Sequence, residues 1–241
     1  MSASEPTDER LSTGVAGLDE MLGGGIPAGH LVLVTGLPGT GKTTLALQFL
    51  VAGLARREKG IYLSLDEEPD ALRATARSLG LALEPGLADR TVELIRLDPR
   101  ETKSSLERLR ASFRDELAAG HVRRLVVDSV SLLNMLSDNE PGRRATLFAL
   151  ANACRAAGTT ALFTAEADPI HPEVSRDGLS EYVADGVILL GYQRSPDGPS
   201  VSLVLRVLKM RRTAHARTVQ PYTLGPNGLV VNARAVDFSA R

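Results

Sequence analysis

Residues 36–43 combine three glycines, a lysine and a threonine at a spacing that suits phosphate binding. The run reads Gly-Leu-Pro-Gly-Thr-Gly-Lys-Thr and matches the pattern G-x-x-x-x-G-K-[ST]. Glycines let successive backbone N–H groups curl around phosphate oxygens, and a helix that starts there directs its positive dipole end at them. Lys42 would reach the β- and γ-phosphates of a nucleotide, and the Thr43 hydroxyl would bind Mg²⁺. A plain Gly/Pro connection is the weaker interpretation, because the motif stands between an apolar strand pattern and a helical one, as it requires.

Carboxylates occur at two further places where a nucleotide site needs them. Asp128 ends the apolar run 124–128, where it would hold Mg²⁺ from behind the direct ligands. Asp66, Glu67 and Glu68 follow another apolar run, and hydrolysis needs a carboxylate that orients and partly deprotonates water. Strand ends at the carboxyl edge of a parallel sheet can present such a group, so we expect catalysis by Asp66 or Glu67 rather than by Glu68. The structural alternative is a helix start, which acids also favour.

A row of polar residues near the C-terminus occupies every second position: Lys209, Arg211, Thr213 and His215. If one strand continues this far, all four side chains project from one face, which they share with the apolar residues Val201, Leu203, Leu205 and Val207. The row could bind phosphate in its own chain or in a neighbouring subunit, as an arginine finger does. Spacing alone favours a solvated basic hairpin tip.

The elements that must position these residues alternate along the chain. We expect strands over 31–35, 60–65, 124–128, 159–164 and 186–190, and helices over 43–55, 69–79, 103–119 and 143–157. This alternation predicts an α/β fold with a mostly parallel sheet and helices on both faces. After Tyr192 the pattern changes, and long strands over 200–209 and 217–223, with a turn at Asn227-Gly228, predict an antiparallel extension.

Length and composition limit the possibilities. A chain of 241 residues with 43% hydrophobic residues suits one large domain, which we expect over 11–241 after a flexible tail over 1–10. The net charge of −1 gives no electrostatic footprint for nucleic acid. The single cysteine, Cys154, lies at helical spacing with apolar residues and is expected to be a buried core thiol. No secretion signal or apolar membrane span is visible, so a cytoplasmic location is expected.

Several segments together resemble the KaiC-like family of RecA-fold ATPases. They are 11–14 with 17–19, the glycine-rich run 23–27, the phosphate motif, 76–80, 126–129 and 209–211. The likeness extends from about Leu11 to Val231 and is that of a single-domain member. It implies a RecA-like phosphate-loop fold, ATP and Mg²⁺ as cofactors, and a homo-oligomeric ring, usually a hexamer, with ATP clamped between subunits.

The resemblance also assigns roles to residues. The paired catalytic acids of the family correspond to Asp66 and Glu67, and we place the main role on Glu67 because Asp66 is one methylene shorter. The implied nucleotide contacts within the chain are Gly36, Gly39, Thr40, Gly41, Lys42, Thr43, Thr44 and, near the base, Ser78. Those implied across the subunit boundary are Lys209, Met210, Arg211, Thr213 and His215, with Lys209 and Arg211 also acting in catalysis. On this ground the basic row is expected to act in trans.

Two departures from the family affect the interpretation. Arg212 stands where the family usually has glycine, and Glu181 with Tyr182 stands where KaiC carries its phosphorylated Ser-Thr pair, although Ser175 and Ser180 lie nearby. We therefore expect a slow, ring-forming ATPase with a regulatory or signalling role, exerted through nucleotide-dependent shape changes on a protein partner. The alternatives are a DNA-acting recombination ATPase and an autophosphorylating kinase.

Overall fold

The structure is a computed structural model, and it describes residues 9–97, 112–133, 139–176, 178, 180–194 and 200–232. A nine-stranded sheet with the order β11-β10-β9-β8-β3-β7-β6-β4-β5 forms its centre. The parallel strands are β3 (Leu31–Gly36), β4 (Lys59–Ser64), β5 (Val92–Arg96), β6 (Val122–Asp128), β7 (Thr160–Glu166) and β8 (Gly186–Arg194). The antiparallel strands are β9 (Val201–Met210), β10 (Gln220–Gly225) and β11 (Gly228–Val231). The α/β fold with a parallel sheet and an antiparallel C-terminal extension is therefore confirmed.

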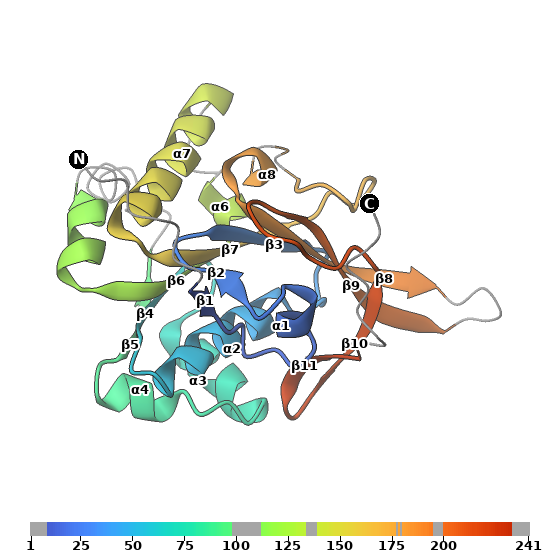
Figure 1. The fold of residues 1–241 in the computed structure, drawn as a ribbon, viewed down its shortest axis with the longest axis horizontal. Helices are drawn as coiled ribbons and strands as arrows, with labels where there is room; N and C mark the ends of the chain where they lie inside the picture. Colours follow the sequence, from blue (N-terminus) through green and yellow to red (C-terminus); the bar gives the residue numbers. More distant parts are fainter. Residues whose placement is uncertain are drawn as a thin grey trace.

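Helices cover both faces of the sheet (Figure 1). On one face lie α2 (Lys42–Leu54), α3 (Pro69–Ser78) and α4 (Glu84–Ala88), and on the other α6 (Val130–Leu133), α7 (Glu140–Ala157) and α8 (Ser180–Val183), together with helical residues 112–119. Side chains of a strand alternate between the two faces. In β3, Val32 and Val34 join the core under α2, whereas Leu31 and Leu33 join the core under α7. Such two-sided burial explains the unbroken apolar strand sequences.

The N-terminal segment forms a small unit of its own that packs on α2. Its elements are β1 (Arg10–Leu11), α1 (Leu18–Met21) and β2 (Ile26–Pro27). Arg10, which the sequence places in the flexible tail, pairs with Pro27 and donates hydrogen bonds to Leu22 O and Gly25 O. The ordered part of the chain thus includes residue 10, and residues 1–8 of the predicted tail lie outside the described residues.

Most predicted elements occur, with different ends. The strand predicted over 217–223 begins only at Gln220, and α7 begins three residues before the prediction because the Asn139 side chain accepts a hydrogen bond from Gly142 N at 2.8 Å. Of the helix predicted over 103–119, residues 103–111 lie outside the described part. Cys154 is buried in the core, as expected, and burial raises the pKa of its thiol to about 12. No helix among the described residues has the length and apolar character to cross a membrane.

Candidate active site

The phosphate motif joins β3 to α2 at the carboxyl edge of the sheet. Its glycines are needed for their backbone geometry, since Gly39 and Gly41 have φ angles of 79° and 88°. A side chain at Gly36 would place its Cβ 2.6 Å from Leu190 O, so the loop also packs closely against β8. Thr40 and Thr44 are buried in the same segment. The sequence folds here into the strand, loop and helix that a phosphate site requires.

Lys42 lies over this loop. Its ammonium donates hydrogen bonds to Gly36 O at 2.9 Å and Leu37 O at 3.2 Å. Burial lowers the pKa of Lys42, and the carboxylates of Asp128 and Glu166 partly offset this by raising it. A half-buried cation beside a ring of backbone groups suits an anionic ligand.

Three hydroxyl groups converge on Asp128 at the end of β6. Thr43 Oγ1 donates to Asp128 Oδ2 at 2.8 Å, and the hydroxyls of Tyr62 and Thr164 donate to the same carboxylate. Burial, and then the neighbouring Asp128, raises the pKa of the Tyr62 phenol well above its ordinary value. The structure therefore brings the two predicted metal-site residues, Thr43 and Asp128, into direct contact.

The donor set fits Mg²⁺ better than a metal that needs a protein cage. Mg²⁺ prefers oxygen ligands and usually binds through one or two protein groups, with water and substrate phosphates completing its shell. Thr43 and Asp128 offer such oxygens. Within the described ranges no cluster of three or more His, Cys, Asp or Glu side chains could hold a metal without a further ligand.

Glu67 and Asp66 follow β4, one strand over from Asp128. Partial burial raises the pKa of Glu67, and the charges of Asp128 and then Asp66 raise it further. Asp66 is exposed, whereas Glu67 is half-buried and its N–H donates to Ser64 Oγ at 2.9 Å. Glu68 forms an ion pair with Arg96 on β5. Of the three acids, Glu67 is the one that the geometry best suits to accept a proton.

Glu166 is a site residue that the sequence does not reveal. It ends β7, whose register places it beside Gly36, and its carboxylate acts on Lys42. Its N–H donates to Ser131 Oγ at 2.8 Å, and Arg176 lies 3.3 Å from its Oε2. The predicted strand stops two residues earlier, at Thr164, so only the observed register brings this acid to the phosphate loop.

The basic row does not form one strand face. Strand β9 ends at Met210, so Arg211, Thr213 and His215 lie beyond it. A bulge also interrupts the alternation, because Val187 pairs with Lys209 while the next residue, Ile188, pairs with Val207. Val207 consequently packs in the core under α2, whereas Lys209 turns to the other face and donates to Glu181 O at 2.9 Å. The prediction of a continuous row was wrong because a period-two pattern cannot reveal a bulge.

The residues of this row are held by contacts within the chain. Arg211 and Arg212 form ion pairs with the buried Asp185 at 3.7 and 3.6 Å. Arg212 has a φ of 60°, so it adopts the left-handed backbone that glycine takes most easily. Thr213 Oγ1 accepts a hydrogen bond from Arg10 at 2.6 Å, and burial lowers the pKa of His215. Arg212, which stands where the family usually has glycine, thus adopts a left-handed turn conformation that glycine adopts more easily.

The two halves of the predicted site lie at opposite ends of the parallel strands. Arg211 N donates to Asp185 O, and Asp185 N donates to Leu31 O, each at 2.8 Å, so Arg211 is tied to the first residue of β3. The phosphate loop begins at Gly36, the last residue of that strand. Five residue steps of an extended strand span about 17 Å, more than an arginine side chain reaches. The structure therefore separates Lys209, Met210 and Arg211 from the phosphate loop of the same chain.

Ser78, the residue expected near the nucleotide base, ends α3. Its hydroxyl donates to Thr75 O at 2.8 Å. Two residues later, a side chain at Gly80 would place its Cβ 2.8 Å from Pro226 O in the β10–β11 turn. The end of α3 and the antiparallel extension therefore lie together on the α2 side of the sheet.

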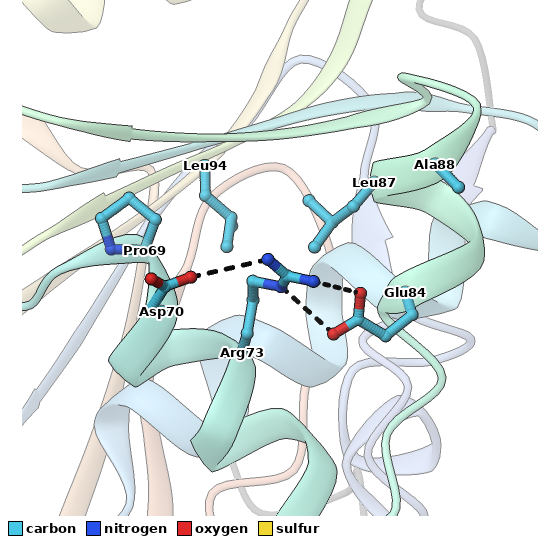
Figure 2. A pocket seen from close by; sticks show the side chains of 7 residues that line it. All are labelled: Pro69, Asp70, Arg73, Glu84, Leu87, Ala88 and Leu94. Carbon is cyan, nitrogen blue, oxygen red and sulfur yellow. Dashed lines mark hydrogen bonds and ion pairs between the residues drawn. The ribbon is translucent and has the colours of Figure 1, made fainter.

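A separate hollow of about 390 Å³ lies between α3, α4 and β5 (Figure 2). Arg73 stands at its centre and is held by Glu84 at 2.9 Å and by Asp70 at 3.5 Å. These carboxylates neutralise the guanidinium. None of the residues that line the hollow belongs to the predicted site.

Comparison with known proteins identifies the family of the chain. A family model described as the KaiC ATPase matches residues 11–236. The circadian clock protein KaiC3 of Synechocystis is 31% identical over 232 residues, which are 92% of this chain but 45% of the relative, so the chain spans about half of that protein. A UPF0273 protein of Pyrococcus horikoshii is 31% identical over 240 residues and is matched over 93% of its length.

A solved structure extends the likeness to three dimensions. The crystal structure of a KaiC-like protein from Pyrococcus horikoshii superposes with a TM-score of 0.81 at 30% identity, covering 93% of this chain and 99% of the other. The family model spans nearly all of the chain, including the phosphate loop, Glu67, Asp128 and the basic residues after β9. The chain therefore belongs to the KaiC family of RecA-fold ATPases.

Proposed function

We propose that this protein is a Mg²⁺-dependent ATPase whose catalytic site is completed by a second copy of the same chain. The observation that carries this proposal is the division of the site. Lys42, Thr43, Glu67 and Asp128 gather at the carboxyl edge of the sheet, whereas Arg211 is fixed at the other edge.

The first part of the site binds the nucleotide. The N–H groups of residues 36–43, except Pro38, which has none, and the start of α2 surround the β- and γ-phosphates, and Lys42 shifts from the loop carbonyls to the phosphate oxygens. Mg²⁺, when bound here, would neutralise charge on these phosphates. Thr43 provides its hydroxyl for the metal, and Asp128 orients that hydroxyl through the 2.8 Å hydrogen bond.

Glu67 activates the attacking water. A carboxylate with a raised pKa is a stronger base than an ordinary one. It orients the water in line with the γ-phosphate and accepts a proton from it as the bond from water to phosphorus forms and the bond to the bridging oxygen of the departing ADP breaks. Asp66, which is more exposed, raises the pKa of Glu67 by its charge.

The second part of the site comes from a neighbouring copy. Lys209 and Arg211 of one chain would stabilise the charge of the transferring phosphoryl group in the next, with Met210, Thr213 and His215 around the nucleotide. A contact that joins opposite edges of the same molecule is head-to-tail, and such contacts generate closed rings when the rotation closes. We propose a ring, and the family resemblance favours six chains.

The biological role follows from such an arrangement. An ATP that touches two chains makes their contact depend on the nucleotide state, so we propose a slow, cytoplasmic ATPase that regulates a protein partner through its shape. Self-phosphorylation is not proposed, because Glu181, in one of the two positions aligned with the phosphorylated pair of KaiC, is an acid that accepts a hydrogen bond from Ser175 Oγ at 2.7 Å.

Phosphate release from ATP tests the proposal. The wild-type protein with Mg²⁺ should release phosphate, and Lys42→Ala should lower the rate at least about 100-fold because it removes charge stabilisation from the transition state. Lys59→Ala is the matched control, since Lys59 forms only a half-exposed ion pair with Glu93. Equal rates for the wild type and Lys42→Ala would overturn the proposed function.

A further inference from the structure

The tyrosines of this chain are concentrated at the candidate site. The sequence contains four, and the hydroxyls of three of them donate to the phosphate loop or its acid. Tyr62 donates to Asp128, Tyr192 of β8 donates to Pro38 O at 2.9 Å, and Tyr222 of β10 donates to Thr40 O at 2.6 Å. The fourth, Tyr182, is 70% exposed.

Side chains donate hydrogen bonds to several carbonyl oxygens of the phosphate loop. Lys42 binds the oxygens of Gly36 and Leu37, and the Thr40 hydroxyl also donates to Leu37 O at 2.7 Å. Tyr192 and Tyr222 hold two further carbonyls of the loop, those of Pro38 and Thr40. A loop that binds phosphate through its N–H groups must keep its carbonyl oxygens away from the anion, because two negative groups repel each other. Once Lys42 turns to a bound phosphate, the Thr40 hydroxyl still holds Leu37 O, and Tyr192 and Tyr222 still hold Pro38 O and Thr40 O.

Close packing shows that the two strands fit against the loop. A Cβ at Gly39 would lie 2.9 Å from the Tyr192 hydroxyl oxygen, and a Cβ at Gly41 would lie 2.7 Å from Leu224 Cδ2. Tyr222 is only 3% exposed, and burial raises the pKa of its phenol, so it remains a hydrogen-bond donor. Its ring is fixed by core contacts and cannot follow the loop if the loop moves.

We propose that Tyr192 and Tyr222 are positioning residues that hold the phosphate loop with its N–H groups directed at the nucleotide. Strand β8 and the antiparallel strand β10 then help to set the affinity for ATP, although neither tyrosine touches the phosphates. This inference rests on the proposed function, because it assumes that the loop binds ATP.

Isosteric substitutions provide the test. In a Glu67→Gln background, which prevents turnover, the dissociation constant for Mg·ATP is measured by calorimetry for Tyr222→Phe and Tyr192→Phe. Each loses one hydrogen bond to a carbonyl, so the constant should rise about three- to tenfold, which corresponds to the net value of such a bond. Tyr182→Phe removes an exposed hydroxyl and is the matched control. It should leave the constant unchanged.

Thermal unfolding without nucleotide separates positioning from stability. If Tyr222→Phe lowers the melting temperature while both tyrosine variants bind ATP as tightly as the background protein, the hydroxyls have only a structural role and the inference is wrong. Because Tyr192 is 45% exposed, Tyr192→Phe should fold even if Tyr222→Phe does not. A background protein that binds no ATP would instead overturn the proposed function itself.

Discussion

At the scale of single residues, the site places a carboxyl group where ionisation is less favourable than in water. Glu67 is half-buried and faces two other acids, Asp128 and Asp66, and both effects raise its pKa. A raised pKa makes the ionised form a stronger base and also removes that form at mildly acidic pH. The same carboxylate is a cost to folding once it is ionised.

The raised pKa of Glu67 gives a prediction for the pH dependence of hydrolysis. The rate should fall as the pH decreases through the raised pKa of Glu67, at a pH above 4.5, the ordinary value for glutamate. Asp66→Asn removes one of the charges that raise this pKa, so the acidic limb of its pH–rate profile should move to lower pH. The measurement is kcat between acidic and neutral pH for both proteins, and coincident limbs would contradict the assignment of Glu67 as the base.

The stability of Glu67→Gln provides a control for that interpretation. A group whose pKa is raised in the folded state stabilises the fold below its unfolded pKa, and this contribution is lost as the pH rises through the folded pKa. Glu67→Gln should therefore abolish hydrolysis at neutral pH without lowering the free energy of unfolding.

At the scale of elements, a buried ion pair fixes the helix of the phosphate loop to the sheet. Arg124 of β6 is 1% exposed, and its Nε lies 2.5 Å from Glu58 Oε2 in the segment between α2 and β4. Its Nη1 donates to Phe49 O at 2.6 Å, and its guanidinium lies 4.7 Å from the centre of the Phe49 ring. Arg124 thus joins α2, β4 and β6 behind the site.

Removing one partner of this pair should destabilise the fold strongly. Arg124→Met leaves the Glu58 carboxylate buried and unpaired, which costs about 3–5 kcal/mol. Urea unfolding at a fixed protein concentration measures this loss. The double variant Arg124→Met, Glu58→Leu removes both charges and should recover much of the stability. A loss below about 1 kcal/mol for the single variant would show that the pair contributes little.

The elements also show which parts of the site could be predicted from the sequence. The phosphate loop was predictable because its lysine, threonine and glycines lie within eight consecutive residues, and their spacing alone defines the chemistry. The strand that precedes Glu67 and the strand that ends at Asp128 were predictable from their apolar runs. Glu166 was not, because its place beside Gly36 depends on the register between β3 and β7.

The remaining differences also arise from tertiary structure. The bulge at Leu208 lies within an apolar run, so nothing in the alternation marks it. The hydroxyl of Tyr192 reaches the loop because β8 lies beside β3, and that of Tyr222 because the antiparallel extension continues the sheet from β8. Long-range contacts of this kind leave no periodic signal in the sequence.

At the scale of the whole molecule, the two sets of functional residues are separated along the strands of one sheet. The phosphate loop stands at the carboxyl edge, and Arg211 is fixed beside the first residue of β3 at the other edge. Strands β9 and β10 connect these regions, because β10 carries Tyr222 and β9 ends just before Arg211. Under the proposed function, the nucleotide held by one chain therefore influences the residues that the same chain provides to the next.

Mixing two inactive variants tests this division most directly. Glu67→Gln lacks the base but keeps Arg211, and Arg211→Ala keeps the base, so each alone should hydrolyse ATP at least about 100-fold more slowly than wild type. In a mixed head-to-tail assembly, some sites join an intact Glu67 to an intact Arg211. At equal amounts these sites are roughly a quarter of the total, provided that the chains exchange freely.

The equimolar mixture should regain roughly a quarter of the wild-type rate, in proportion to those repaired sites. A mixture of Glu67→Gln with Lys42→Ala is the control, because both changes affect the half-site at the carboxyl edge. Either chain can supply Arg211, but no chain retains both Lys42 and Glu67. This control mixture should therefore stay inactive. If the mixture of Glu67→Gln with Arg211→Ala shows only the summed rates of its two variants after exchange, Arg211 does not act between chains. That result would contradict the composite site.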